Sequence, residues 1–127
     1  MKIKVSEATN TQLDWMVAKC EGELDRCDYY LHESTGAFML EHGEVSVTYS
    51  PSTKWSQGGP IIEREGIDTL VVPCVLKLVP KRWAAEFIAK PADKYHRREG
   101  PTPLIAAMRC YVASKLGDEV EVPEELL

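Results

Sequence analysis

The 127-residue sequence lacks the features that would place it outside the small globular proteins. No apolar run approaches the roughly 20 residues that a membrane span needs. The opening stretch "MKIKVSEATN" has basic residues but no apolar segment behind them, so it does not read as a secretory signal. No low-complexity tract occurs, and 44% of the residues are hydrophobic. We therefore expect one domain with a single core, located in the cytoplasm.

Motifs typical of enzymes and metal sites are also missing. The P-loop pattern, the nucleophile elbow and H-E-x-x-H are absent. Cys20, Cys27 and His32 lack the close C-x-x-C pairing that structural zinc uses. The four cysteines of the chain, Cys20, Cys27, Cys74 and Cys110, are expected to be reduced thiols. The sequence thus predicts no catalytic group, no metal and no cofactor.

Charge is unevenly distributed along the chain, whose net charge is −5. The last ten residues, 118–127, carry five acids and no base, which equals the whole net charge. Residues 77–98 carry seven Lys and Arg against two acids. A uniformly basic face for nucleic acid is therefore absent. The basic segment indicates either a local anion site or a solvated strand edge and loop.

Periodicity and boundary residues predict two clear helices, one near each end of the chain. The first covers 9–22, where Thr9 and Gln12 have the spacing of a capping box. The last follows Thr102 as the cap and Pro103 as its first residue.

A middle helix is predicted around the sequence "SQGGP". Ser52 or Thr53 can cap a helix that includes Trp55 and ends before Gly66. Pro60 cannot sit deep in a regular helix without a kink. The helix either bends at the Gly-Gly-Pro, or a single turn precedes a helix that starts at Pro60.

The remaining segments are predicted as strands and loops. Strands are expected at 2–5, 37–49 (a hairpin), 67–79 (with Pro73 at a bulge or edge) and 81–90, which is also Ala-rich enough to be helical. Loops are expected at 23–36 and 91–101, and an extended acidic tail at the C-terminus. This mixture predicts a single α+β domain with a mainly antiparallel sheet.

Trp55 is surrounded by loop-forming residues in "YSPSTKWSQGGP". It either packs into the core beneath the kinked helix or stacks on a planar ligand at the mouth of a pocket. The polar side chains of Ser52, Thr53 and Gln57 favour the ligand slightly, because they would be costly inside a dry core.

Two helix starts and the basic loop together suggest a phosphate site. Helix N-termini attract anions, although ordinary capping explains the same residues. Arg97 or Arg98 would hold a phosphate beside Thr102, while Trp55 or Tyr95 stacks on a base. The predicted ligand-binding residues are Ser52, Thr53, Trp55, Gln57, Tyr95, Arg97, Arg98 and Thr102.

Three stretches, "LDWMVAKCEG", "YSPSTKWSQGGPIIERE" and "GPTPLIAAMRCYVASKLGDEVEVPEELL", resemble the NinX-like proteins of lambdoid phages. The order of the motifs along the chain is also similar to that in the phage ABA-sandwich domain. The corresponding segments are 13–18, 49–53, 83–87 and 102–109. The resemblance implies an α/β/α sandwich with helices on both faces of a sheet and a strand at 81–90. It also implies a phage accessory protein in an infected bacterial host, and it supplies no chemistry.

Three functions are carried forward. The leading one is a non-catalytic protein that binds and sequesters a small anionic ligand, such as a host immune signalling nucleotide. The second is an adaptor for a host or phage protein that uses the acidic stretches 21–33 and 118–127. The third is a hydrolase of a signalling nucleotide with His96 as its base. A strand edge or the tail could also pair two copies as a homodimer.

Overall fold

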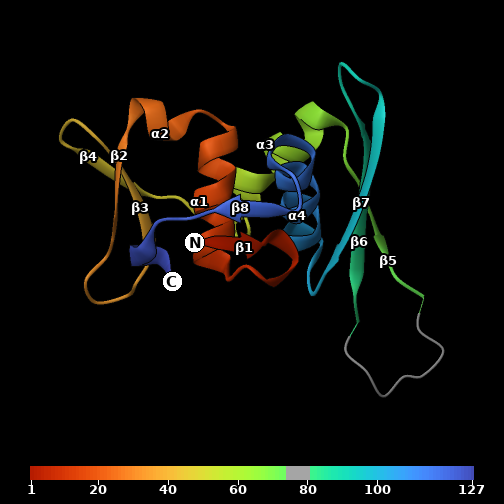
Figure 1. The fold of residues 1–127 in the computed structure, drawn as a ribbon. Helices are drawn as coiled ribbons and strands as arrows, with labels where there is room; N and C mark the ends of the chain where they lie inside the picture. Colours follow the sequence, from red (N-terminus) through yellow and green to blue (C-terminus); the bar gives the residue numbers. More distant parts are fainter. Residues whose placement is uncertain (74–80) are drawn as a thin grey trace.

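Helix α4 (Pro103–Leu116) runs through the middle of the molecule, between two three-stranded sheets (Figure 1). The computed structural model describes residues 1–73 and 81–127. Nine of the fourteen α4 residues are buried, so the helix is enclosed on nearly every side. Thr102 caps it by accepting a hydrogen bond from the Ile105 N–H at 3.1 Å, as the sequence predicts.

Eight strands form three antiparallel sheets in the described residues. One sheet contains β2 (Asp28–Leu31), β3 (Phe38–His42) and β4 (Val45–Thr48), and another contains β5 (Asp68–Val71), β6 (Trp83–Ala89) and β7 (Lys94–Gly100). A two-stranded ribbon joins β1 (Lys2–Lys4) to β8 (Glu119–Glu121). The other helices are α1 (Asn10–Cys20), α2 (Glu23–Arg26) and α3 (Trp55–Glu65), with short 3-10 turns at Val5–Glu7 and Glu124–Leu126. The α+β class and the antiparallel pairing are confirmed.

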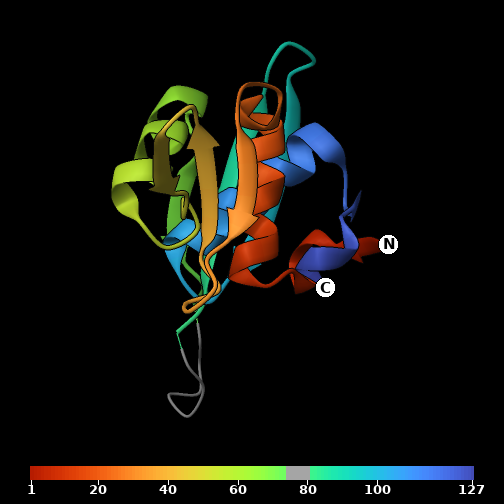
Figure 2. The same ribbon diagram turned by 90° about the vertical axis from the view of Figure 1, so that its left-hand side faces the viewer.

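The helices lie between the two larger sheets (Figures 1 and 2). Helix α4 packs on β6 and β7, and α1 packs against both α4 and β3. This layer order differs from helices on both faces of one sheet, which the resemblance implies. The outward face of β5–β7 carries the ion-paired Glu86, Arg97 and Glu99, so this face of the antiparallel sheet is polar enough to meet water.

The prediction of a loop at 91–101 is wrong, because Lys94–Gly100 pairs along its whole length with β6. Only His96 and Gly100 of this strand are buried, so no apolar alternation marks it. Gly100 has a packing role, since a Cβ there would lie 2.9 Å from the Ala106 backbone nitrogen of α4. A charged sequence can thus form a strand because α4 lies so close to it.

The prediction of an irregular segment at 23–36 is also wrong in part. Helix α2 occupies its start, and β2 pairs with β3 in the register Tyr29 with Leu40 and Leu31 with Phe38. Only every second residue of β2 faces inward, and the acidic residues around it hide that short alternation.

The middle helix is continuous through Pro60, which neither starts nor interrupts it. Lys54 is the residue before it, and no side chain caps it, so the expected capping by Ser52 or Thr53 is wrong. Gly66 ends the helix in a left-handed conformation (φ 71°), as predicted.

The acidic tail is folded into the domain. Strand β8 pairs with β1, and Val120, Val122 and Leu126 are buried in the core. The Gln12 side chain donates a hydrogen bond to the Leu126 carbonyl at 2.8 Å. The acidic side chains of the tail are therefore exposed and these three apolar side chains are buried. The sequence "VEVPEELL" shows this pattern, because apolar and acidic residues alternate at its start.

Other sequence predictions concern individual segments. The strands at 2–5, 81–90 and the hairpin at 37–49 are confirmed. The strand expected at 67–79 ends at Val71, and its residues 74–79 lie outside the described part, as does Cys74. Cys20, Cys27 and Cys110 are free thiols. None of the described helices combines the length and the apolar character needed to cross a bilayer.

Candidate functional site

The first residues of α1, α3 and α4 meet at one pocket. Asn10, Trp55 and Pro103 are these three residues, and all of them line a cavity of about 290 Å³. The other lining residues are Ser52, Thr53, Thr102, Leu104 and Ile105. We call this cavity the Trp55 pocket. Since each helix N-terminus carries roughly half a positive charge, their convergence favours an anion.

Trp55 faces outward rather than into the core. Its side chain is 55% exposed at the start of α3, whereas Leu104 and Ile105 of α4 are buried beneath the pocket. An exposed indole beside an apolar floor offers a flat surface on which a planar ring can stack. The core position of Trp55, one of the two that the sequence leaves open, is therefore wrong, and the indole lies at the surface where it lines the Trp55 pocket.

The start of α4 leaves one backbone N–H group without an acceptor inside the helix. The first N–H groups of a helix have no acceptor inside it. Thr102 takes the Ile105 N–H, and Pro103 has no N–H to offer. The Leu104 N–H is the remaining donor of this turn, and Leu104 is one of the residues that line the pocket.

Ser52 lies at the base of the pocket and contacts Asp14 through two groups. It is 1% exposed, and its Oγ is enclosed by the protein. Its backbone N–H donates to Asp14 Oδ1 at 2.9 Å, and its hydroxyl group also interacts with the Asp14 carboxyl. Ser52 therefore holds the buried carboxyl in place behind the pocket.

Asp14 is a buried carboxyl group directly behind Ser52. It is 4% exposed, and burial raises its pKa to about 6, although hydrogen bonding from the Ser52 side chain and from the Ser52 backbone N–H opposes the rise. The group is therefore ionised at neutral pH at a cost in stability. It sets the electrostatics of the floor without lining the pocket.

Asp14→Asn is expected to stabilise the protein above pH 7 by about 1–3 kcal/mol, because it removes a buried charge and keeps an oxygen for the Ser52 N–H. Because the pKa of Asp14 is raised in the folded state, its contribution to the stability of the fold is complete only below the unfolded-state pKa near 4. This contribution is lost as the pH rises through about 6. The difference between variant and wild type should thus shrink towards pH 4 in urea unfolding series. A variant that is less stable at pH 8 would contradict this account.

Gln57, one of the predicted ligand-binding residues, has a structural contact instead. Its amide accepts from the Ser50 N–H and donates to the Thr48 carbonyl at 2.7 Å. These two bonds attach α3 to the end of β4. Gln57 does not line the Trp55 pocket.

Tyr95, Arg97 and Arg98 lie on β7, away from the Trp55 pocket. Tyr95 donates to Glu86 at 2.7 Å, and Arg97 donates to Glu99 at 3.2 Å, both on the outward face of the sheet. Arg98 points to the opposite face, because successive residues of a strand alternate. The expected phosphate site that joins these arginines to Trp55 and Thr102 is therefore not assembled.

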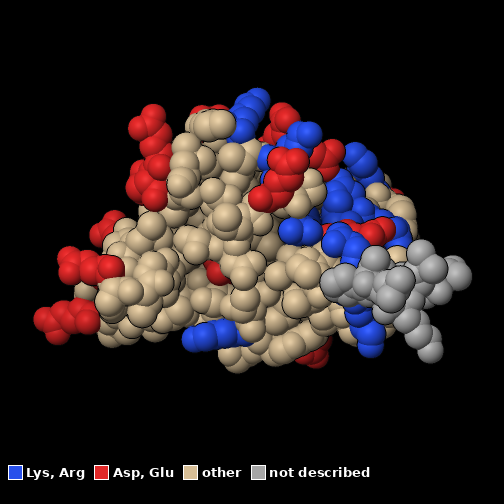
Figure 3. Space-filling view, turned by 90° about the horizontal axis from the view of Figure 1, so that it is seen from below, with Lys and Arg blue, Asp and Glu red and all other residues tan. Residues whose placement is uncertain are grey.

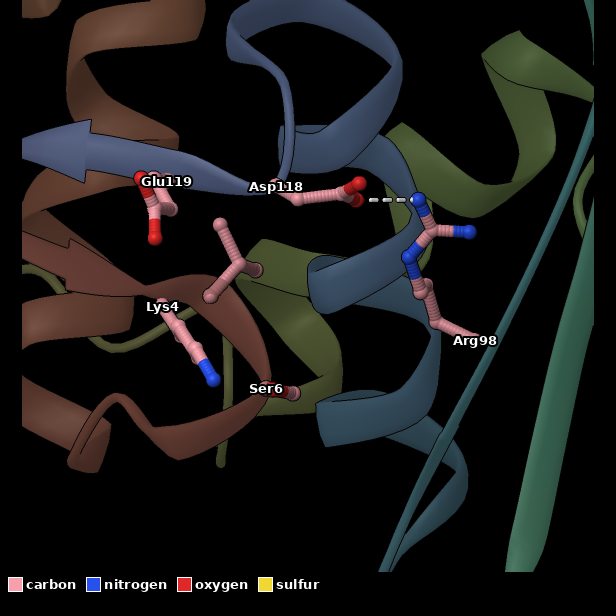
Figure 4. Close-up of a pocket in the computed structure, with 6 residues that line it drawn as sticks. Lys4, Ser6, Arg98, Asp118 and Glu119 are labelled. Atoms are coloured by element: carbon pink, nitrogen blue, oxygen red, sulfur yellow. Dashed lines mark hydrogen bonds and ion pairs between the residues drawn. The ribbon is translucent and has the colours of Figure 1, made fainter.

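Arg98 lines a second cavity of about 430 Å³ between β7, β1 and the loop before β8 (Figure 4). Its guanidinium is paired with the Asp118 carboxylate, and the two side chains point toward each other. Lys4 and Glu119 add one charge of each sign to the lining. The cavity is thus electrically balanced and gives no preference for an anion.

His96, the base that a hydrolase would need, is in the core. It is 8% exposed and packs against Phe87 with ring centroids 6.0 Å apart. Burial lowers its pKa, so the ring stays neutral at physiological pH. It does not line the Trp55 pocket.

The charges on the surface agree with the separation of the Trp55 pocket from the arginines of β7. Figure 3 views the side on which α1 and α4 begin, and the middle of that face is largely uncharged. Lys and Arg gather toward the end with β5–β7, and Asp and Glu toward the end with β2–β4. An anion held at the helix starts would therefore be bound mainly by neutral donors.

Four of the predicted site residues line the Trp55 pocket: Ser52, Thr53, Trp55 and Thr102. The sequence analysis does not predict Asn10 and Leu104, which also line it, or Asp14, which lies behind Ser52. Asp14 carries a usable signal, because an acidic residue stands between the core residues Leu13 and Trp15. The contribution of Leu104 is a backbone N–H, which no side-chain pattern reveals.

The chain matches the protein family described as "Bacteriophage P22, NinX" over residues 4–115, which is most of its length. No curated protein matches it. The matched span includes every residue that lines the Trp55 pocket. By this match, the chain belongs to the NinX family of bacteriophage proteins.

Proposed function

We propose that this phage accessory protein binds a small ligand that has one planar ring and one anionic group. The ligand occupies the Trp55 pocket and is held without being converted. The observation that carries this proposal is the convergence of three helix N-termini beside an exposed tryptophan. Ring stacking and helix-end anion binding are the two interactions that recognise a nucleotide.

Sequestration is the role that suits such a site in a phage protein. None of the described residues lining the Trp55 pocket has an ionisable side chain, and His96 is buried elsewhere, against Phe87. A binding site without a general acid or base can hold a ligand and lower its free concentration. A host immune signalling nucleotide in the bacterial cytoplasm is the class of ligand that a phage gains by withdrawing.

The adaptor function has less support. The tail 118–127 would be its arm, yet Val120, Val122 and Leu126 are buried and the Met1 ammonium pairs with Glu121 at 2.7 Å. A partner could still bind the outward acidic side chains. The tail itself, however, cannot be released without exposing part of the core.

Trp55→Ala is expected to weaken binding of the nucleotide with little effect on folding, because the side chain is half-exposed. Base stacking on an aromatic residue contributes about 1–3 kcal/mol, so affinity should fall by roughly 10- to 100-fold. Thermal unfolding would be followed with a panel of cyclic and ADP-ribose-type nucleotides. The wild type should gain melting temperature with at least one of them, and the variant should not.

Tyr95→Ala is the matched control. Tyr95 is 57% exposed, as Trp55 is 55% exposed, but it lies on the outward face of β7. This variant should keep the ligand-dependent shift of the wild type. Loss of the shift in Tyr95→Ala and not in Trp55→Ala would move the site to β7. A wild type that responds to no nucleotide would refute the proposed function.

A further inference from the structure

The donors of the Trp55 pocket are all neutral. Its lining offers the hydroxyl groups of Thr53 and Thr102, the amide of Asn10 and the backbone N–H of Leu104. Among the described residues, no lysine or arginine contributes to the lining. Sites that bind a doubly charged phosphate use guanidinium or ammonium groups, which match its charge and geometry. This pocket has only helix ends to balance the ligand charge.

A carboxylate behind the pocket limits the negative charge that the site can accept. Asp14 Oδ1 lies 2.9 Å from the Ser52 backbone nitrogen, and Ser52 forms the base of the pocket. Because both residues are almost fully buried, repulsion between Asp14 and a bound anion is weakly screened. Asp14 also takes the Ser52 N–H and interacts with the Ser52 hydroxyl, so Ser52 adds no donor for the ligand.

The size of the cavity also favours a ligand with a single phosphate group. Its volume of about 290 Å³ is at the lower end of the range for small-molecule sites. One ring on Trp55 and one phosphate near Ser52 would fill it. A ligand with several phosphates would have to leave the others unpaired at the surface.

We infer that the Trp55 pocket selects a singly charged phosphodiester, as in a cyclic mononucleotide, over the doubly charged phosphomonoester of the same nucleoside. This inference rests on the proposed function and narrows its ligand class. The Leu104 N–H at the start of α4 holds a phosphodiester oxygen, and Trp55 stacks on the base. Asp14 excludes the second charge.

Calorimetric titration at pH 7.5 tests the inference with three ligands of one base: the nucleoside, its 3′,5′-cyclic monophosphate and its 5′-monophosphate. Adenine, guanine and uracil sets would each be measured. For the base that binds, the cyclic form should bind at least about tenfold more tightly than either of the others, about 1.4 kcal/mol. An equal or tighter 5′-monophosphate overturns the inference and leaves the proposed function standing. A nucleoside that binds as well as the cyclic form overturns both, because the proposed ligand is recognised by its anionic group.

Two variants separate the parts of the mechanism. Asp14→Asn should tighten binding of the 5′-monophosphate more than that of the cyclic form, which narrows the ratio between them. Trp55→Ala should weaken the binding of all three ligands alike and leave the ratio between them unchanged, because each of them contains the base. An unchanged ratio in Asp14→Asn would overturn the role given to Asp14. If no ligand of any base binds the wild type, the proposed function fails, and the inference fails with it.

Discussion

Gly58→Ala is expected to destabilise the protein by about 3 kcal/mol, because there is no room for a side chain. A Cβ at this position would lie 2.4 Å from the Pro51 carbonyl oxygen and 2.6 Å from Leu104 Cδ2. The carbonyl is backbone and cannot turn away, so α3 would have to move off α4 and off the segment before it. Urea unfolding measures the loss, and the same movement would open the Trp55 pocket.

Gly59→Ala is the control, one residue further along the same helix. Its nearest neighbour would be Trp55 Cε3 at 3.9 Å, an ordinary contact. In a helix interior, replacing glycine by alanine stabilises by roughly 0.5–1 kcal/mol. The two neighbouring glycines should therefore respond with opposite signs. Equal tolerance of both substitutions would show that α3 does not pack against α4 as described.

Removal of residues 118–127 is expected to leave a chain that no longer unfolds cooperatively. Val120, Val122 and Leu126 are each at most 7% exposed, and burial of such a side chain contributes about 1.5–3 kcal/mol. Their loss removes about 5 kcal/mol or more from a domain whose total stability is of the order of 5–15 kcal/mol. The truncation also leaves β1 without its partner strand. Circular dichroism during heating measures the change.

The control for the truncation keeps the tail and removes two of its five acidic charges. Glu119→Gln and Glu124→Gln alter exposed acidic residues and leave the three apolar ones in place. This double variant should melt as sharply as the wild type. A truncated chain that melts sharply near the wild-type temperature would contradict the packing of the tail. It would also restore the tail as a free arm for a partner.

Local signals account for the elements that the sequence predicts correctly. The caps of α1 and α4 and the turn of the β3–β4 hairpin are short-range patterns, so a single sequence reveals them. Strand β7 has no such pattern, because it depends on β6 beside it and on α4 beneath Gly100. Pro60 lies inside α3, although a proline in a helix interior usually kinks or ends the helix.

The candidate site shows the same division between local and non-local information. Ser52, Thr53, Trp55 and Thr102 are found because each stands near a helix start, and helix starts converge in this fold. A phosphate site that includes both Arg97 and Arg98 depends on the predicted loop at 91–101. Because this segment is a strand, consecutive side chains point to opposite faces of the sheet, and the two arginines cannot bind the same phosphate.

Two-dimensional amide NMR of the protein during titration with a cyclic mononucleotide tests the central claim most directly. The account predicts shifts at the Leu104 and Ser52 amides and at the Trp55 indole, with the β7 amides and the tail unchanged. No shift with the cyclic nucleotide of any base, or shifts centred on Arg98 and Asp118, would contradict it.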